Sequence, residues 1–96
     1  MIQYIFVDDM RIPESNCIVC KTYKSAIHAI KNAIKNQYDI VLDLDHDLGG
    51  NKSGYDICRY LINNNIKIKG YRVHTSNPVG RNNIIQLMSR YGYKLM

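Results

Sequence analysis

The sequence predicts a three-layer α/β domain in which helices cover both faces of a five-stranded, mostly parallel sheet. Short apolar runs of strand length alternate along the chain with longer segments whose apolar residues recur at helical spacing. Strands that alternate with helices are joined by right-handed crossovers, which make neighbouring strands parallel. The chain has 96 residues, so we expect a single domain over residues 1–96.

The first part of the chain contains three expected strands and one expected helix. Residues 2–7 (IQYIFV) and 17–22 (CIVCKT) have the composition of strands, and residues 39–43 (DIVLD) form the apolar run of a strand covered on both faces. Residues 23–36 repeat alanine and isoleucine at the spacing of an amphipathic helix. Only nine residues, interrupted by Pro13, separate the first two strands, so we expect the first helix of the domain to be reduced.

The second part of the chain is expected to hold two helices and two strands. An amphipathic helix follows the glycine-rich loop after the third strand. Residues 69–76 (KGYRVHTS) form a strand candidate that leads into Asn77 and Pro78, a favoured helix cap and a favoured first helical residue. The last helix is expected to end at Gly92, and residues 93–96 (YKLM) are expected to form the fifth strand.

The charges of the chain are distributed unevenly. The net charge is +5, and five of the eight acidic residues lie in two clusters, Asp8 and Asp9, and Asp43, Asp45 and Asp47. Only three acidic residues therefore remain against 13 Lys and Arg over the rest of the chain. Such a basic surface attracts phosphorylated ligands. Nucleic acid is not an expected partner, because the chain has no Lys/Arg-rich block, no aromatic–basic alternation and no groove-reading motif.

Membrane association and disulfide bonds are also not expected. No run of about 18 apolar residues and no signal-peptide pattern is present, so we expect a soluble, cytoplasmic protein without a membrane partner. Cys17 and Cys20 have the spacing of a redox motif, but they lie on an expected strand, where residues three apart face opposite sides. Together with Cys58, on an expected helix, they are interpreted as buried or half-buried thiols.

Polar residues follow three of the expected strands, at the point where each strand ends. The carboxyl ends of parallel strands meet at one edge of the sheet, where ligands bind. We therefore expect three groups to meet at this edge: Asp8 with Asp9, the group Asp43, Asp45 and Asp47, and the segment His74 to Asn77.

The crowded carboxylates need a positive partner, because like charges a few ångströms apart raise one another's pKa. A divalent metal, the side chain of Arg11 or retained protons can each meet this need. Aspartate oxygens suit Mg²⁺ or Mn²⁺, and His46 and His74 shift the preference towards Mn²⁺, iron or Zn²⁺. The expected metal ligands are Asp8, Asp9 and Asp45.

The fourth strand and the helix after it supply an expected anion site. Backbone N–H groups at a helix N-terminus bind phosphate, and Gly80 lets a ligand approach closely. Arginine side chains nearby can pair with phosphate oxygens. The candidate substrate-binding residues are Arg11, Ser76, Asn77, Gly80, Arg81 and Asn82.

This layout resembles the receiver domains of response regulators, which have a flavodoxin-like fold. An acidic pair follows strand one, an aspartate follows strand three and a Ser/Thr follows strand four, with Asp45 at the position of the phosphoacceptor. Two features differ from a receiver. The helix between the first two strands is reduced, and the lysine–proline pair of the last strand is missing, with Lys94 only loosely placed to replace the lysine.

A more specific resemblance covers almost the whole chain. The combination DDMRIP, LDHDLGG and VHTSNPVGRNNI is similar to the cyclic-phosphate processing receiver-like domain family, found in bacteria and phages. The resemblance implies handling of cyclic nucleotides, or of RNA ends that carry a cyclic phosphate, by hydrolysis or by binding. Its functional positions would be Asp8, Asp9, Arg11, Asp45, His46, Asp47, His74, Ser76 and Asn77.

The first functional hypothesis is a phosphoesterase that hydrolyses a cyclic phosphodiester. Metal on the three aspartates would polarise the phosphoryl group, and His46 or His74 would act as general acid or base. Asp47 would orient the histidine that it contacts, so the expected catalytic residues are Asp45, His46, Asp47 and His74. Two alternatives stay open: a module that sequesters a cyclic nucleotide without turnover, and a receiver switched by phosphorylation of Asp45. Homo-oligomerisation is also left open.

Overall fold

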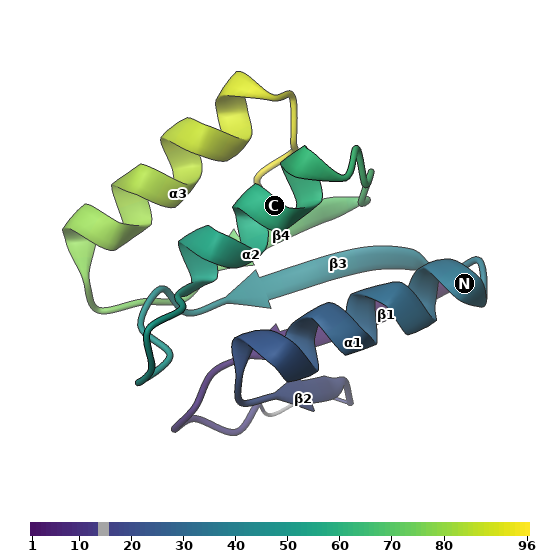
Figure 1. Cartoon of the computed structure of the whole chain (residues 1–96), viewed down its shortest axis with the longest axis horizontal. Helices are drawn as coiled ribbons and strands as arrows, with labels where there is room; N and C mark the ends of the chain where they lie inside the picture. The colour runs from purple at the N-terminus through teal and green to yellow at the C-terminus, as the bar shows by residue number, and fades with distance from the viewer. Residues whose placement is uncertain (14–15) are drawn as a thin grey trace.

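The computed structural model describes residues 1–13 and 16–96 and contains one four-stranded sheet (Figure 1). In chain order the elements are β1 (Ile2–Val7), β2 (Ile18–Cys20), α1 (Tyr23–Lys35), β3 (Asp39–Leu44), α2 (Gly54–Asn63), β4 (Gly70–Val73) and α3 (Pro78–Arg90). The strands lie in the order β2-β1-β3-β4, and every neighbouring pair is parallel. The predicted parallel α/β sheet is therefore confirmed.

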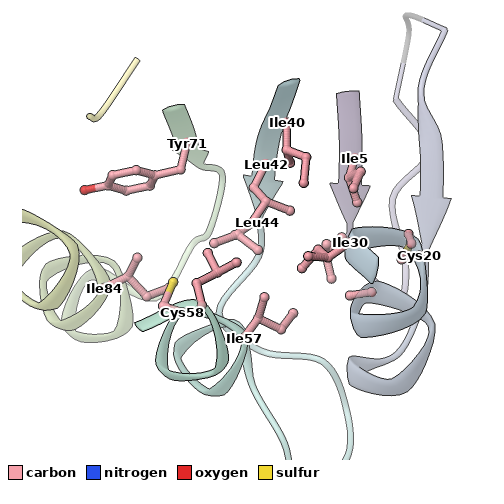
Figure 2. Packing of buried hydrophobic residues seen from close by; sticks show 14 of the residues in the cluster. Ile5, Cys20, Ile30, Ile40, Leu42, Leu44, Ile57, Cys58, Tyr71 and Ile84 are labelled. Atoms are coloured by element: carbon pink, nitrogen blue, oxygen red, sulfur yellow. The ribbon is translucent and has the colours of Figure 1, made fainter. Parts of the chain in front are cut away.

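The register of the strands brings one set of apolar side chains to one face of the sheet. Ile5 pairs with Leu42, and Leu42 pairs with Tyr71, so these three residues face the same side. Figure 2 shows them pointing towards residues of the helices, such as Ile30 and Ile57. These residues belong to a single buried apolar cluster to which all three helices contribute, so the hydrophobic core lies on this face.

The expectation of helices on both faces of the sheet is wrong for the described residues, because all three helices lie on one side of it (Figure 2). The connections from β2 to β3 and from β3 to β4 both run in the same direction across the sheet. Right-handed crossovers that run in one direction place their helices on one face. The connection from β1 to β2 runs the other way, but its described residues form no helix. The described domain thus has two layers, not three.

The opposite face of the sheet carries the alternate residues of the same strands. Tyr4 is 42% exposed and Val19 is 40% exposed, whereas Phe6 and Val41 are buried. A hollow of about 360 Å³ lies against this face, with Phe6, Val41 and Arg72 among its lining residues. Parallel sheets usually have both faces covered. The apolar side chains that remain exposed here reflect the missing helical layer.

The expected fifth strand is also not formed. Residues 93–96 run beside β4, but they make only one isolated parallel bridge, between Tyr71 and Leu95. Two hydrogen bonds hold this bridge: Tyr71 N donates to the carbonyl of Lys94 at 2.9 Å, and Met96 N donates to the carbonyl of Tyr71 at 2.8 Å. The pairing has the expected position and direction but is too short to count as a strand.

The helices begin at caps that also shape the loops above the sheet. Asn77 caps α3 with its side-chain oxygen, which accepts a hydrogen bond from Gly80 N at 2.9 Å. Before α2, Ser53 N donates to the carboxylate of Asp56 at 2.7 Å. Gly54 packs so closely on the carbonyl of Asp45 that a Cβ there would lie 2.2 Å from the oxygen. The start of α2 is therefore fixed against the end of β3.

The helices are short. Both α1 and α3 have 13 residues, and α2 has 10. In the part of the chain that the structure describes, no helix combines the length and the apolar character needed to cross a bilayer.

Candidate functional site

Three aspartates meet at the edge of the sheet where β1 and β3 end. Each of Asp8, Asp9 and Asp45 offers a carboxylate oxygen, and these oxygens all lie within 4.8 Å of one another. Asp8 is 1% exposed, and the other two are half-buried. The structure thus brings together the three residues that the sequence suggests as metal ligands.

The backbone after β1 and a histidine hold Asp8 in place. Its Oδ1 accepts hydrogen bonds from Met10 N at 2.8 Å and Arg11 N at 2.9 Å, and its Oδ2 lies 3.0 Å from His74 Nε2. Burial alone would raise the pKa of Asp8, but the two N–H groups and His74 outweigh it, so the pKa is lowered. A fully buried carboxylate is thereby kept ionised.

His74 bridges two carboxylates. Besides the contact with Asp8, its Nδ1 lies 2.6 Å from Asp43 Oδ1. Its ring stacks on Phe6, with the ring centroids 4.4 Å apart and the planes 5° from parallel. Burial alone would lower the pKa of His74, but hydrogen bonds and charge from Asp43 and Asp8 outweigh it, so the pKa is raised. The ring therefore favours the imidazolium form and links the ends of β1, β3 and β4.

Asp43 and Phe6 both contact His74, although neither is among the catalytic, metal-binding or substrate-binding residues expected from the sequence. They are cross-strand partners in the β1–β3 register, on the face of the sheet without helices. Asp43 is part of the acidic cluster seen in the sequence, but it lies within the apolar strand, ahead of its end. The signal that points to it is its position, because a carboxylate inside an apolar strand needs a charged or hydrogen-bonding partner.

A second group lies where the loop after β3 meets the start of α3. His46 Nδ1 lies 2.9 Å from Asp47 Oδ1, and Asn77 Nδ2 donates to Asp47 Oδ2 at 3.4 Å. The hydrogen bond with His46 lowers the pKa of Asp47. The ring of His46 packs on Gly80, where a Cβ would lie 2.5 Å from the ring Cγ. Close packing on a helix N-terminus and pairing with a carboxylate therefore position this ring.

The loop after β3 also contacts the acidic cluster. Gly49 has a φ of +74°, and a Cβ at this position would lie 2.6 Å from Asp9 Oδ2. Asp45 Oδ1 accepts a long hydrogen bond, 3.4 Å, from Asp47 N. The conformation of this loop thus couples the three aspartates to the pair of His46 and Asp47.

The candidate substrate-binding residues occupy different environments. Asn77 and Gly80 lie beside the pair of His46 and Asp47, as described above. Arg81 Nη1 donates to the carbonyl of Val73 at 2.7 Å, so part of its guanidinium fixes the end of β4. The remaining candidates, Arg11, Ser76 and Asn82, are exposed. Arg11 approaches Asp8 through its backbone N–H.

The acidic cluster lies at an open edge of the fold. Two hollows, of about 540 Å³ and 360 Å³, lie elsewhere, and none of the three clustered aspartates lines either of them. Asp43 lines the smaller hollow from the face without helices. A ligand of the cluster would therefore bind at the surface of this edge rather than inside one of these hollows.

Comparison with known proteins agrees with this geometry. No curated protein and no solved structure matches the chain. Residues 3–90 match the family model of the cyclic-phosphate processing receiver domain, which confirms the resemblance of the sequence motifs. The parallel sheet and the acidic edge between β1 and β3 are consistent with a receiver-like fold. The chain therefore belongs to the cyclic-phosphate processing receiver domain family.

Proposed function

We propose that this protein is a metal-dependent phosphoesterase that opens the cyclic phosphodiester of a nucleotide or of an RNA end. One observation carries the proposal: the oxygens of Asp8, Asp9 and Asp45 converge within 4.8 Å, next to a loop that presents a histidine paired with an aspartate. Clustered carboxylates suit a divalent metal, and a positioned imidazole suits proton transfer to or from a phosphate ester.

The donor set fits Mg²⁺ or Mn²⁺. All three residues of the cluster are aspartates, and hard carboxylate oxygens are the ligands that these cations prefer. Asp8 accepts two hydrogen bonds at Oδ1 and one at Oδ2. Since a carboxylate has about four acceptor positions, Oδ2 retains the capacity to bind a cation. The chemistry that such a metal supplies is Lewis-acid polarisation of a phosphoryl oxygen.

His46 is the proposed general acid or base. Its Nδ1 is engaged by Asp47, which fixes the tautomer and leaves Nε2 to exchange a proton with the substrate. The contact with Gly80 and the bond from Asn77 to Asp47 keep the pair in place. Asp47 therefore acts through His46 and is a positioning residue.

His74 has a different proposed role. Both of its ring nitrogens face carboxylates, Asp43 at Nδ1 and Asp8 at Nε2. A histidine held in this way has no nitrogen left for a substrate proton while both contacts persist. We therefore assign His74 to holding the carboxylate of Asp8 and to offsetting part of its charge, and not to proton transfer.

The start of α3 and Arg11 are the proposed partners of the phosphate. Helix N-termini carry partial positive charge and favour anions. Within the first turn, Pro78 has no N–H and Gly80 N donates to Asn77, so Val79 supplies the N–H for a phosphate oxygen. Arg11 is exposed and lies two residues after Asp9, so its guanidinium can reach a ligand at this edge.

The test is incubation of the purified protein with 2′,3′-cyclic and 3′,5′-cyclic nucleotides, with Mn²⁺, with Mg²⁺ or with a chelator, followed by chromatography of the products. We expect linear monophosphates only when metal is present. Asp45→Asn and His46→Ala should each reduce the rate by about 10²- to 10⁴-fold, whereas His28→Ala, on the exposed face of α1, should not change it.

Two results would contradict the proposal. If no cyclic nucleotide gave a linear product with either metal, the hypothesis that the protein hydrolyses them would be wrong. If the nucleotides still bound at the acidic edge, the protein would instead be a module that sequesters them. Full turnover by His46→Ala would show that the proton-transfer residue has been assigned wrongly.

A further inference from the structure

A second candidate site lies at the end of the sheet opposite the acidic cluster. A hollow of about 540 Å³ opens between two segments, residues 62–69 before β4 and residues 91–94 after α3. Lys94 provides the carbonyl that pairs with Tyr71 near the start of β4, whereas the clustered aspartates follow the carboxyl ends of β1 and β3. The volume is within the range of about 300–1,000 Å³ that small-ligand sites have.

The hollow is basic. Lys67, Lys69 and Lys94 line it, all three are exposed, and no acidic residue is among the described residues that line it. Three lysines and no described acidic residue around one opening give it a positive potential, which attracts anions. The hollow therefore complements a ligand that carries negative charge, such as a phosphate group.

The hollow also offers aromatic surface. Tyr91 and Tyr93 line it. Tyr91 is 56% exposed, so its ring is accessible to a ligand. The hydroxyl of Tyr93 donates to the carbonyl of Ile66 at 2.5 Å, which ties the two segments together. Aromatic faces of this kind stack on nucleobases with little preference for sequence.

The two segments that line the hollow are each held by a turn that contains a residue in the left-handed conformation. Asn65 has a φ of 53° just after α2, and Gly92 has a φ of 80° just after α3. Backbone hydrogen bonds close both turns, from Ile66 N to Leu61 O at 2.9 Å and from Tyr93 N to Met88 O at 3.0 Å. The lysines and tyrosines are therefore carried by fixed backbone, which reduces the entropy lost when a ligand binds.

We propose that this hollow is a nucleotide-binding site, in which Lys67, Lys69 and Lys94 hold the phosphate and Tyr91 stacks on the base. The site goes beyond the proposed phosphoesterase activity, because it uses none of the residues of the acidic edge. The nucleotide can come from two sources, a free mononucleotide or the end of an RNA strand, and both present the same phosphate and base.

The test is a titration of the ¹⁵N-labelled protein, followed by two-dimensional NMR, with 5′-AMP, with a short oligoadenylate and with inorganic phosphate. We expect shifts of the amides of residues 66–69 and 91–94, affinity that falls as salt is raised, and much weaker binding of phosphate alone. Stronger binding of the oligoadenylate than of 5′-AMP would identify the end of an RNA strand as the natural ligand. Stronger binding of 5′-AMP would identify a free nucleotide.

Substitutions can test recognition of the phosphate and of the base separately. Lys67→Glu with Lys69→Glu should weaken 5′-AMP binding by about tenfold or more, and Tyr91→Ala by at least about fivefold. The matched control is Lys24→Glu with Lys31→Glu, which makes the same charge change at exposed positions of α1. The control pair should bind as wild type.

The outcomes that overturn the proposal are distinct from those that test the acidic edge. Shifts confined to residues near Asp8 and Asp45, or no shift at millimolar 5′-AMP, would remove the site. Equal binding of phosphate and 5′-AMP, or unchanged binding by Tyr91→Ala, would reduce it to a general anion surface. None of these results depends on catalytic turnover. The nucleotide-site proposal can therefore be tested even if the proposed phosphoesterase activity is not found.

Discussion

The imidazole of His74 lies 3.0 Å from the buried carboxylate of Asp8, although 66 residues separate the two in the chain. The second ring nitrogen of His74 binds Asp43, so one side chain at the end of β4 joins the ends of the two central strands. The two carboxylates raise the pKa of His74, which favours its charged form. His74 is therefore a structural link across the sheet and, when protonated, a partial counter-charge for the candidate metal site.

Replacing His74 should destabilise the protein strongly. In His74→Ala the carboxylate of Asp8, only 1% exposed, loses its charged partner. Removing one partner of a buried charged pair leaves an uncompensated charge, and we expect a loss of about 2 kcal/mol or more in the free energy of unfolding. Urea denaturation measures it. His28→Ala, at an exposed position of α1, is the control and should change stability by no more than about 0.5 kcal/mol.

A double-mutant cycle distinguishes the pair from general damage to the core. If the stability lost in His74→Ala comes from the contact with Asp8, the loss should be smaller when Asp8 is already Asn, because no buried carboxylate remains to be compensated. Additive losses from the two substitutions would show that the pair contributes little of its own.

Divalent metal should stabilise the fold through the acidic cluster. A ligand that binds only the folded state raises the melting temperature, and at 100 times its dissociation constant the gain is about 2.7 kcal/mol. Mn²⁺ and Mg²⁺ should raise the melting temperature of wild type but not of Asp45→Asn. Asp39→Asn, which changes an exposed aspartate at the start of β3, should respond as wild type. An unmoved wild-type curve would mean that the proton on His74 and the backbone donors neutralise the cluster without metal.

Much of the fold follows from local patterns in the sequence. The apolar runs of β1 and β3, the helical spacing of α1 and the cap at Asn77 all lie where the pattern indicates. The carboxyl ends of parallel strands lie at the same edge of a sheet, and this rule alone predicts that Asp8 and Asp45 lie close together, as they do in the structure. These features depend on short-range periodicity or on a general property of parallel sheets.

The errors concern features that depend on the whole topology. The apolar run of β3 suggested cover on both faces, but one face of the sheet carries no helix in the described chain, since the connections through α1 and α2 run in the same direction across the sheet. The loosely placed Lys94 lines the basic hollow near the start of β4 and so cannot replace a lysine at the carboxyl edge. The role of Asp43 depends on cross-strand register, which a single sequence does not contain.

Thiol reactivity should distinguish Cys58 from Cys17. Burial raises the pKa of Cys58 to about 12, and its side chain is fully buried, whereas Cys17 is half-buried. At pH 8 only about one Cys58 thiol in 10⁴ is ionised in the folded state. A disulfide reagent such as Ellman's reagent should therefore modify Cys17 first and Cys58 only after unfolding. The fast modification should be absent from Cys17→Ser, which would assign it to Cys17. Fast modification of Cys58 in that variant would contradict the buried position of Cys58.

The same pKa predicts how stability changes at high pH. Because the folded-state pKa of Cys58 is above the ordinary thiol value of 9.0, its contribution to stability is complete below about pH 9 and is lost as pH rises towards 12. The decline of unfolding free energy over this range should be shallower in Cys58→Ala than in wild type. Tyrosines also titrate in this range, so the comparison is between the slopes of the two proteins at matched pH.

Gly80→Ala should impair function more than stability, if His46 transfers the proton. A Cβ at this position would lie 2.5 Å from the ring Cγ of His46, so the ring must move. Alanine is a better helix former than glycine by up to about 1 kcal/mol, which offsets part of the strain. A displaced catalytic group can cost about 10²-fold in rate. We therefore expect hydrolysis of a cyclic nucleotide to fall by that order while the unfolding free energy changes by less than about 1 kcal/mol.

Two comparisons isolate the contact between Gly80 and His46. Gly50→Ala is the matched control, because a Cβ at that position meets no atom within 4 Å, and it should leave both rate and stability unchanged. In a His46→Ala background the added methyl group has no ring to displace, so Gly80→Ala should stabilise the protein by its helix propensity alone. A Gly80→Ala variant with wild-type turnover would show that the position of His46 against α3 is not required for catalysis.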